Sequence, residues 1–312
     1  LVPYTYEGGV YALPETQTFL MMFYRKDILK ELNLEVPQTW EDVANLLAVL
    51  NKNNMQFGLP LVITPSYPGE NLPPNPLFSA LLMQNGGEFY RDGGRVSGLD
   101  SPIAVETFKM WTEFYTDYKL EREFDFANRF RTGEMPIGIW DYTIYNQLTV
   151  FAPEIRGMWG FAPVPGTVRE DGTIRHDVTS TGVGTIMLKN AQDKEAAWEF
   201  MKWWTSAETQ TKFGREMEGL MGAAARYPTA NIEALDSLPW PVQDYANLKE
   251  QFQWVQGIPE VPGGYFTGRH LINAFYRVVV NGNNEPRETI IEYVEYIHDE
   301  IRAKRKEFGL PE

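Results

Sequence analysis

The side chains best suited to hold a ligand are aromatic rings that stand next to acidic and hydroxyl groups. Trp140, Asp141 and Tyr142 form a predicted turn between a strand over 136–139 and a helix. Open α/β sheets bind ligands at such carboxyl ends of strands, and large rings beside hydrogen-bonding groups suit hydroxylated ring faces. The turn therefore predicts a stacking site for a sugar-like ligand, and ordinary packing of the rings is the alternative.

A second candidate lies in the loop over 261–270, which reads VPGGYFTGRH. Tyr265 and Phe266 are adjacent rings and Arg269 follows them at the start of a predicted helix. We expect these three side chains to contact a ligand, unless the rings only anchor the following helix. Tyr67, in a loop over 61–76 that holds five prolines, is a weaker candidate of the same kind.

Catalysis and metal binding find little support in the sequence. The chain has no cysteine, and its three histidines lack a partner at metal-ligand spacing. It has no nucleophile elbow, no Walker loop and no dinucleotide fingerprint. A glycosidase would need two carboxylates across a cleft, and Glu15 and Asp141 are the best placed. We expect them instead to accept hydrogen bonds from hydroxyls or to cap helices, with no catalytic residue, no cofactor and no metal.

The amino-acid composition indicates which kinds of binding partner are to be expected. The formal charge of −14 argues against a nucleic-acid surface, because phosphates attract clustered Lys and Arg. Aromatic residues, at 14%, are numerous enough to include ligand-stacking rings as well as core. No run of about 18 apolar residues occurs, so no transmembrane segment is expected. The chain opens on Leu-Val-Pro, without the basic and apolar regions of a signal peptide.

The predicted elements alternate between strands and helices, which favours layered α/β architecture. Thr39 and Ser101 are predicted N-caps, and Asn85-Gly86-Gly87 is a predicted helix end. Strands are expected over 10–14, 19–24, 136–139 and 182–188, and helices over 43–50, 77–84, 101–117, 125–131, 195–205, 208–217, 269–280 and 288–308. The tryptophans of the 195–205 helix are expected in the core or between lobes.

Several motifs, taken in order, resemble the bacterial extracellular solute-binding proteins of the maltose-binding-protein type. They are YALPETQTFLMMFYRKD, NGGEFY, FRTGEMPIGIWDY, WGFAPVPG and GVGTIMLKNAQDKEAAWEFMKWWTSAETQ, and together they run from about Tyr11 to the end. The chain departs from the family in two ways. The family's Gly-Pro-Trp turn reads Trp140-Asp141-Tyr142 here, so the stacking ring is offset, and the first strands of the opening lobe have no counterpart.

The resemblance implies an α/β, periplasmic-binding-protein-like fold of type II, present largely as one lobe plus a remnant of the other. Residues 1–16 would be a strand from the first lobe and hinge, 17–181 and 232–312 the second lobe, and 185–230 the remnant. In the family, ligand contacts come from the first crossover, the loop after the second helix, the aromatic turn and the start of a late helix, and we add the second crossover. Carried onto this sequence, they are Glu15, Gln17, Thr18, Tyr67, Trp140, Asp141, Tyr142, Thr181, Gly182, Tyr265, Phe266 and Arg269.

The implied function is capture of a carbohydrate between two lobes for an ABC importer. The partners would be the sugar, the membrane permease subunits and the absent N-terminal lobe, and the location extracellular, with a lipoprotein anchor upstream. Other readings stay open: the same scaffold could bind a peptide, polyamine or organic acid, serve as a sensor or docking module, or act as a glycosidase through Glu15.

Overall fold

The computed structural model of the chain describes residues 2–59, 61, 75–282 and 285–311. Its strands are β1 (Thr5–Tyr6), β2 (Gly9–Val10), β3 (Leu13–Pro14), β4 (Thr18–Arg25), β5 (Phe57–Gly58), β6 (Tyr90–Arg91), β7 (Val96–Ser97), β8 (Ile137–Asp141), β9 (Trp159–Ala162), β10 (Thr167–Val168), β11 (Ile174–Arg175), β12 (Val178–Thr181), β13 (Gly184–Thr185) and β14 (Val255–Gln256).

The α-helices are α1 (Lys26–Glu31), α2 (Trp40–Lys52), α3 (Pro76–Gln84), α4 (Pro102–Thr116), α5 (Phe126–Thr132), α6 (Ile144–Phe151), α7 (Lys194–Trp204), α8 (Ala207–Met221), α9 (Ile232–Ser237), α10 (Val242–Phe252), α11 (Tyr265–Val279) and α12 (Pro286–Glu307). Short 3₁₀ turns are η1 (Val2–Tyr4), η2 (Asp92–Gly94), η3 (Pro153–Ile155) and η4 (Ala223–Ala225).

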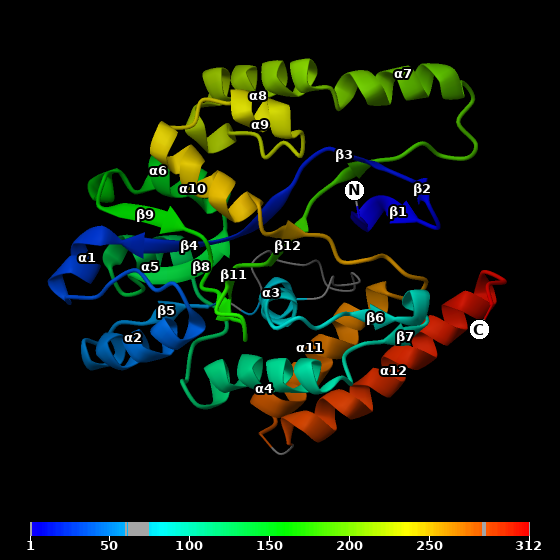
Figure 1. Ribbon diagram of the computed structural model, residues 1–312. Helices are drawn as coiled ribbons and strands as arrows, with labels where there is room; N and C mark the ends of the chain where they lie inside the picture. The colour runs from blue at the N-terminus through cyan, green and yellow to red at the C-terminus, as the bar shows by residue number, and fades with distance from the viewer. Residues whose placement is uncertain (1, 60, 62–74, 283–284, 312) are drawn as a thin grey trace.

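A sheet in the order β14-β12-β4-β8-β5 organises the larger part of the molecule (Figure 1). The apolar run of β4 explains its central place, since Phe19 to Phe23 are all buried. β4 pairs antiparallel with β8, with Leu20 opposite Asp141, and also with β9 and β12. β5 and β14 join parallel to their neighbours, which gives the mixed sheet of a layered α/β fold.

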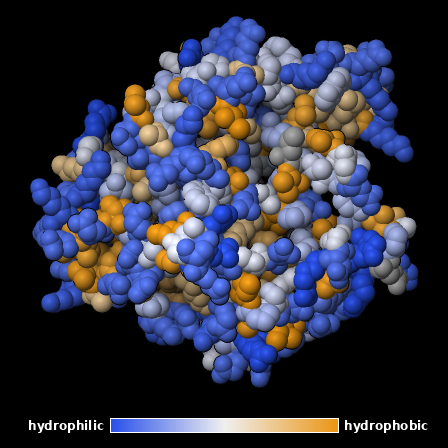
Figure 2. Space-filling view, in the orientation of Figure 1, coloured by the Kyte–Doolittle hydropathy of each residue, from blue (hydrophilic) through white to orange (hydrophobic). Residues whose placement is uncertain are grey.

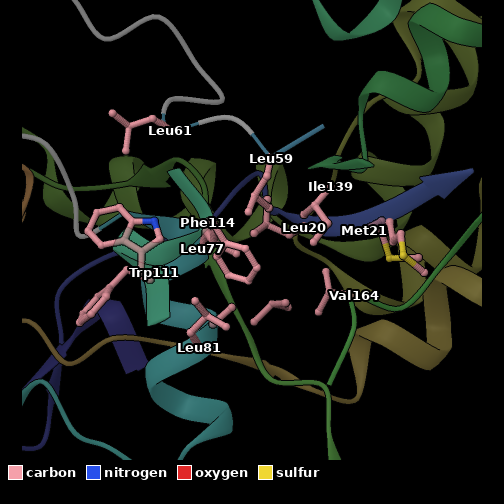
Figure 3. Packing of buried hydrophobic residues seen from close by; sticks show 14 of the residues in the cluster. Leu20, Met21, Leu59, Leu61, Leu77, Leu81, Trp111, Phe114, Ile139 and Val164 are labelled. Atoms are coloured by element: carbon pink, nitrogen blue, oxygen red, sulfur yellow. The ribbon is translucent and has the colours of Figure 1, made fainter. Parts of the chain in front are cut away.

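Helices pack on this sheet through large apolar side chains. α3 lies between the sheet and α4 and contacts both (Figure 1). Figure 3 shows Leu77 and Leu81 of α3 near Trp111 and Phe114 of α4, with Leu20 of β4 close by. α4, α11 and α12 contact one another and form a helical layer behind α3. This core holds the strand ends in place and so positions the loops that follow them.

The N-cap residues predicted from the sequence begin the helices that were expected after them. Thr39 caps α2 in a capping box with Asp42, and Ser101 caps α4 ahead of Pro102. α3 ends at Gln84, and Asn85 is its C-cap, as predicted. The helix expected over 269–280 begins earlier, at Tyr265, because Gly263 and Gly264 supply the turn that starts it.

A smaller part of the chain, 185–230, carries α7, α8 and η4 and lies at the top of Figure 1. Arg226 ties it to the larger part. Its guanidinium donates to both carboxylate oxygens of Glu218, at 3.0 and 2.6 Å, and lies 4.4 Å over the Trp240 ring. The side chains of Arg226 and Glu218 are only 7% and 15% exposed, so this ion pair is nearly removed from water.

The strand expected over 182–188 is wrong in its extent, because only Gly184 and Thr185 pair, with β3. Ile186 and Leu188 are exposed, and no described strand lies beside them. On α7, Trp198 and Trp203 are also exposed, so neither belongs to the core of the described chain. These exposed apolar side chains of 183–204, which we together call the α7 face, are Val183, Ile186, Leu188, Trp198, Phe200 and Trp203. Apolar atoms gather beneath α7 in Figure 2.

Candidate functional site

Three chain segments cross between the smaller and the larger part at one place. Backbone bonds tie them together: Glu15 N–H donates to Val183 at 2.8 Å, Gln17 N–H to Pro228 at 2.9 Å and Ala230 N–H to the Glu15 carbonyl at 3.0 Å. The contact of the crossing strands is close, because a Cβ on Gly182 would lie 2.1 Å from the Thr16 carbonyl oxygen. Glycine is therefore required at position 182.

Glu15 joins all three crossing segments through its side chain. Its carboxylate accepts one hydrogen bond from the Thr185 hydroxyl at 2.9 Å and one from the Tyr227 hydroxyl at 3.2 Å. Burial, followed by the charge of Glu15, raises the pKa of Tyr227, so the phenol stays a donor. Both carboxylate oxygens are thus engaged in holding the crossover, and Glu15 is absent from the walls of the adjoining cavities.

A cavity of about 870 Å³ opens beside the crossing segments. Figure 2 shows the surface hollowed between the part that carries α7–α9 and the part that carries α11 and α12. Its walls combine hydroxyl and amide side chains with rings and carboxylates: Tyr4, Thr16, Gln17, Ser180, Thr181, Thr205, Asn231, Glu233, Phe252 and Glu260. A volume of this order is typical of pockets for small organic ligands.

Some polar side chains in the wall of the larger cavity already make hydrogen bonds within the protein, and others make none with described residues. The Gln17 amide and the Ser180 hydroxyl make no hydrogen bond with any residue that the structure describes. The Thr181 hydroxyl shares a hydrogen bond of 2.9 Å with Thr18, which stands behind it. Asn231 caps α9 with its oxygen, and its amide nitrogen donates to the Thr205 carbonyl at 2.9 Å. Gln17 and Ser180 are therefore the side chains available to a ligand without breaking an existing bond.

A smaller cavity of about 240 Å³ adjoins the larger one and shares Ser180, Thr181 and Glu260 with it. Tyr90 and Tyr265 add rings to its wall. The Tyr90 hydroxyl is 3.2 Å from the Gly264 carbonyl and 2.9 Å from the Thr267 hydroxyl, so the ring is held in place. Burial raises the pKa of Tyr90, which keeps the phenol neutral.

The rings of the aromatic turn after β8 were expected to stack on a ligand, but in the structure they pack against other parts of the protein. Trp140 stacks on Phe126, with ring centroids 5.2 Å apart and planes 7° from parallel. Tyr142 is 3% exposed and donates to the Gln17 carbonyl at 3.0 Å. Neither ring, nor Asp141, is among the residues that line the two cavities. Tyr142 therefore supports the backbone of Gln17 from below.

Asp141 accepts hydrogen bonds from the Thr143 amide at 2.9 Å and from the Thr143 hydroxyl at 2.7 Å. Burial raises the pKa of its carboxyl above the usual range, and bonds from Thr143 and Thr18 oppose that rise. Asp141 therefore accepts a hydrogen bond from a hydroxyl, one of the two roles expected from the sequence, and the start of α6 has no side-chain cap among the described residues.

Of the three candidate residues at the start of α11, one lines a cavity and the other two pack behind it. Tyr265 lines the smaller cavity, and Phe266 packs on it with ring centroids 4.3 Å apart. The Arg269 guanidinium lies 5.0 Å from the centre of the Phe266 ring. Tyr67 falls outside the described residues. Of the sites predicted from the sequence, Gln17, Thr181, Gly182 and Tyr265 line the two cavities.

Sequence reasoning missed Tyr4, Ser180, Asn231, Phe252 and Glu260, which also line the cavities. Ser180 and Asn231 adjoin predicted crossovers and could have been added on that ground. Tyr4, Phe252 and Glu260 lie outside any recognised motif, and only the fold brings them together.

Over the described ranges, no group of three or more His, Asp or Glu side chains could hold a metal ion. Within the same residues, none of the helices combines the length and apolar character that crossing a bilayer requires.

Comparison with known proteins places this geometry in context. The sequence pattern of the family described as bacterial extracellular solute-binding protein matches residues 1–211. A putative binding protein of Brucella abortus is 27% identical over 229 residues, which are 68% of this chain and 52% of that protein. A maltotriose-binding protein of Pyrococcus abyssi is 26% identical over 209 residues, 64% of this chain and 41% of that protein. The chain thus spans about half the length of the curated relatives it matches.

Solved structures with a similar fold cover nearly all of the chain. The sugar-binding protein MalE from Xanthomonas citri has a TM-score of 0.77 at 18% identity, over 99% of this chain and 75% of that one. A solute-binding protein of an ABC transporter from Thermotoga lettingae, bound with α-D-tagatose, has a TM-score of 0.73 at 19% identity, over 96% and 74%.

Proposed function

Because this chain belongs to the bacterial extracellular solute-binding protein family, we propose that it captures a carbohydrate for an ABC importer. The fold predicted from the sequence, α/β and periplasmic-binding-protein-like of type II, is confirmed by the likeness to MalE and the tagatose-bound protein. The ligand would sit in the larger cavity beside the crossing segments. Hinge closure of the two lobes would then present the loaded receptor to the permease subunits.

One observation carries this proposal: the wall of the larger cavity contains both unengaged hydrogen-bonding groups and aromatic rings. The Gln17 amide and Ser180 hydroxyl are free to bond sugar hydroxyls, and Tyr4 and Phe252 supply apolar faces in the same wall. Sugars need this pairing, because one face of the ring is apolar while its rim carries hydroxyls. A buried hydroxyl without a partner costs free energy, so matched donors and acceptors also give selectivity.

The α7 face supports a further part of the proposal, the presence of an additional first-lobe segment. About a quarter of the MalE chain has no counterpart in this sequence, since the match covers 75% of that protein. We place the corresponding segment against the α7 face, where it would cover exposed Trp198 and Trp203 and complete the wall opposite Glu260. The domain division expected from the sequence, with the remnant over 185–230, is kept as part of this proposal.

Location follows from the same family membership. We place the protein outside the cytoplasm, and a lipid anchor on a segment upstream of this sequence would hold it near the permease. The family consists of solute-binding proteins, and in this proposal the chain binds its ligand without turning it over.

Thermal-shift screening against mono- and oligosaccharides tests the proposal. It would use this chain and a version lengthened by the first-lobe segment, because a ligand raises the melting temperature by mass action. We expect a shift that Gln17→Ala and Ser180→Ala both reduce, while Asn51→Ala on the exposed side of α2 keeps it. The absence of a shift with every sugar, in both versions, would contradict carbohydrate capture.

A further inference from the structure

The walls of the two cavities carry negative charge without any positive charge. Among the described residues that line them, Glu233 and Glu260 are acidic, and none is a lysine, arginine or histidine. The larger cavity contains both carboxylates, and Glu260 also lines the smaller one. A ligand that spans the two cavities therefore passes Glu260 and meets no compensating cation from these walls.

Glu260 is unpaired within the described part of the chain. No hydrogen bond or ion pair joins its carboxylate to a described residue. Glu260 is exposed at the cavity surface, and partial burial of its carboxyl raises the pKa of that group. Burial raises the pKa of Tyr4, and the negative charge of Glu260 raises it further. The carboxylate is therefore close enough to interact electrostatically with the Tyr4 phenol in the cavity wall.

Two carboxylates that are largely removed from water have cationic partners, whereas the buried carboxylate of Asp141 is held by hydrogen bonds from Thr143. Asp177 is fully buried and receives two bonds from Arg175, at 2.8 and 2.7 Å. Glu218 is bound in the same way by Arg226. A partly desolvated charge without a partner is unfavourable, and it gains most from a cation that arrives with hydrogen-bond donors. Glu260 departs from the pattern of the other two, and it does so at the junction of the two cavities.

We propose that Glu260 is a specificity-determining residue that selects carbohydrates bearing a protonated amino group over neutral sugars and rejects sugar acids. This inference rests on the proposed carbohydrate binding and names the class of sugar. An ammonium group next to the carboxylate forms a charge-assisted hydrogen bond, which is about twice as strong as a neutral one. A carboxylate on the ligand would instead face Glu260, and Glu233 in the larger cavity, without a cation to offset the repulsion.

The test compares glucose, glucosamine and glucuronic acid, and disaccharides of each with the same linkage. Isothermal titration calorimetry near neutral pH would use whichever version of the chain binds sugar in the thermal-shift screen. We expect the amino sugar to bind about tenfold more tightly than the matched neutral sugar, and the acid more weakly than both. Matching the linkage within each comparison removes the effect of ring geometry.

Glu260→Gln keeps the size and hydrogen-bonding capacity of the side chain and removes its charge. We expect it to abolish the preference for the amino sugar, so that the amino and neutral sugars bind with equal affinity. Glu233→Gln is the matched control, since it removes the other carboxylate of the larger cavity. It should retain the preference. Glu260→Lys should invert it toward the sugar acid, which a merely misfolded variant would not do.

The outcomes separate the inference from the proposal beneath it. Equal binding of neutral and amino sugars by the wild-type chain overturns the role of Glu260 and leaves carbohydrate capture standing. A preference that survives in Glu260→Gln and disappears in Glu233→Gln also overturns it. If no sugar of any charge binds, carbohydrate capture fails, and this inference fails with it.

Discussion

The ion pair between Arg226 and Glu218, both in the smaller part, should stabilise the junction by holding Arg226 against Trp240 and Tyr145 of the larger part. Arg226 follows η4 in the smaller part, and its guanidinium contacts Trp240 at 4.4 Å and Tyr145 at 5.6 Å. It also donates to the Pro239 carbonyl at 3.2 Å. The perturbation of choice is Glu218→Gln, which preserves shape and leaves Arg226 without a counter-charge.

The magnitude follows from burial and geometry. With side-chain exposures of 7% and 15%, little water can replace the lost carboxylate around Arg226. Removing one partner of a buried ion pair costs about 3–5 kcal/mol. A glutamine oxygen can still accept one of the two bonds, so we expect a loss of about 2–3 kcal/mol. At about 2 °C per kcal/mol for a chain of this size, the melting temperature should fall by about 4–6 °C.

The control is Glu199→Gln on α7. Glu199 also pairs with a cation, Lys202, at 2.7 Å, but these side chains are 72% and 46% exposed. Exposed ion pairs contribute little, so this variant should lose well under 1 kcal/mol. Urea denaturation and calorimetry on both variants measure the difference. Equal losses, or a loss below 1 kcal/mol in Glu218→Gln, would refute the reasoning that burial of this pair stabilises the junction.

Three other variants probe the crossover, the aromatic turn and the α7 face. Gly182→Ala would force a Cβ to 2.1 Å from the Thr16 carbonyl and should destabilise by about 1–3 kcal/mol in urea; Gly219→Ala, in open space within α8, should instead gain about 0.5–1 kcal/mol. Burial raises the pKa of Asp141, so its charge costs stability at neutral pH and the cost fades on acidification through that raised pKa to the ordinary Asp range. Asp141→Asn should therefore resist urea better than wild type at neutral pH but not at low pH, and a gain that grows with acidity would count against this assignment. Trp203→Asp should reduce self-association of the isolated chain in size-exclusion chromatography, because Trp203 is 56% exposed on an apolar face; a wild-type chain that already runs as a monomer would show the idea to be wrong.

Predictions that depend on a few adjacent residues succeeded. The capping box of Thr39 and Asp42 and the Ser101-Pro102 start are both present. Each is decided by hydrogen bonds within a single turn, so neighbouring residues contain all the information required. The apolar run over 19–24 likewise predicted a strand, and its burial on both faces places β4 inside the sheet.

The structure brings only some of the residues predicted for the ligand site to the cavity walls. Gln17, Thr181 and Gly182 lie on crossing segments and do line the larger cavity. Trp140 and Tyr142 are equally plausible in sequence, yet one stacks on Phe126 and the other is buried beneath Gln17. Whether a ring faces a ligand or the core depends on what packs against its strand, which adjacent residues do not determine.

By itself, then, the sequence determined the α/β class and most helix starts. The tertiary structure alone decided which side chains meet in the cavities, because Tyr4, Gln17, Ser180, Asn231 and Glu260 come from distant segments. It also decided that Glu15 holds the crossover through Thr185 and Tyr227. The physical reason is that caps and periodicity are local interactions, whereas a cavity wall and its charge balance arise from contacts between residues far apart in the chain.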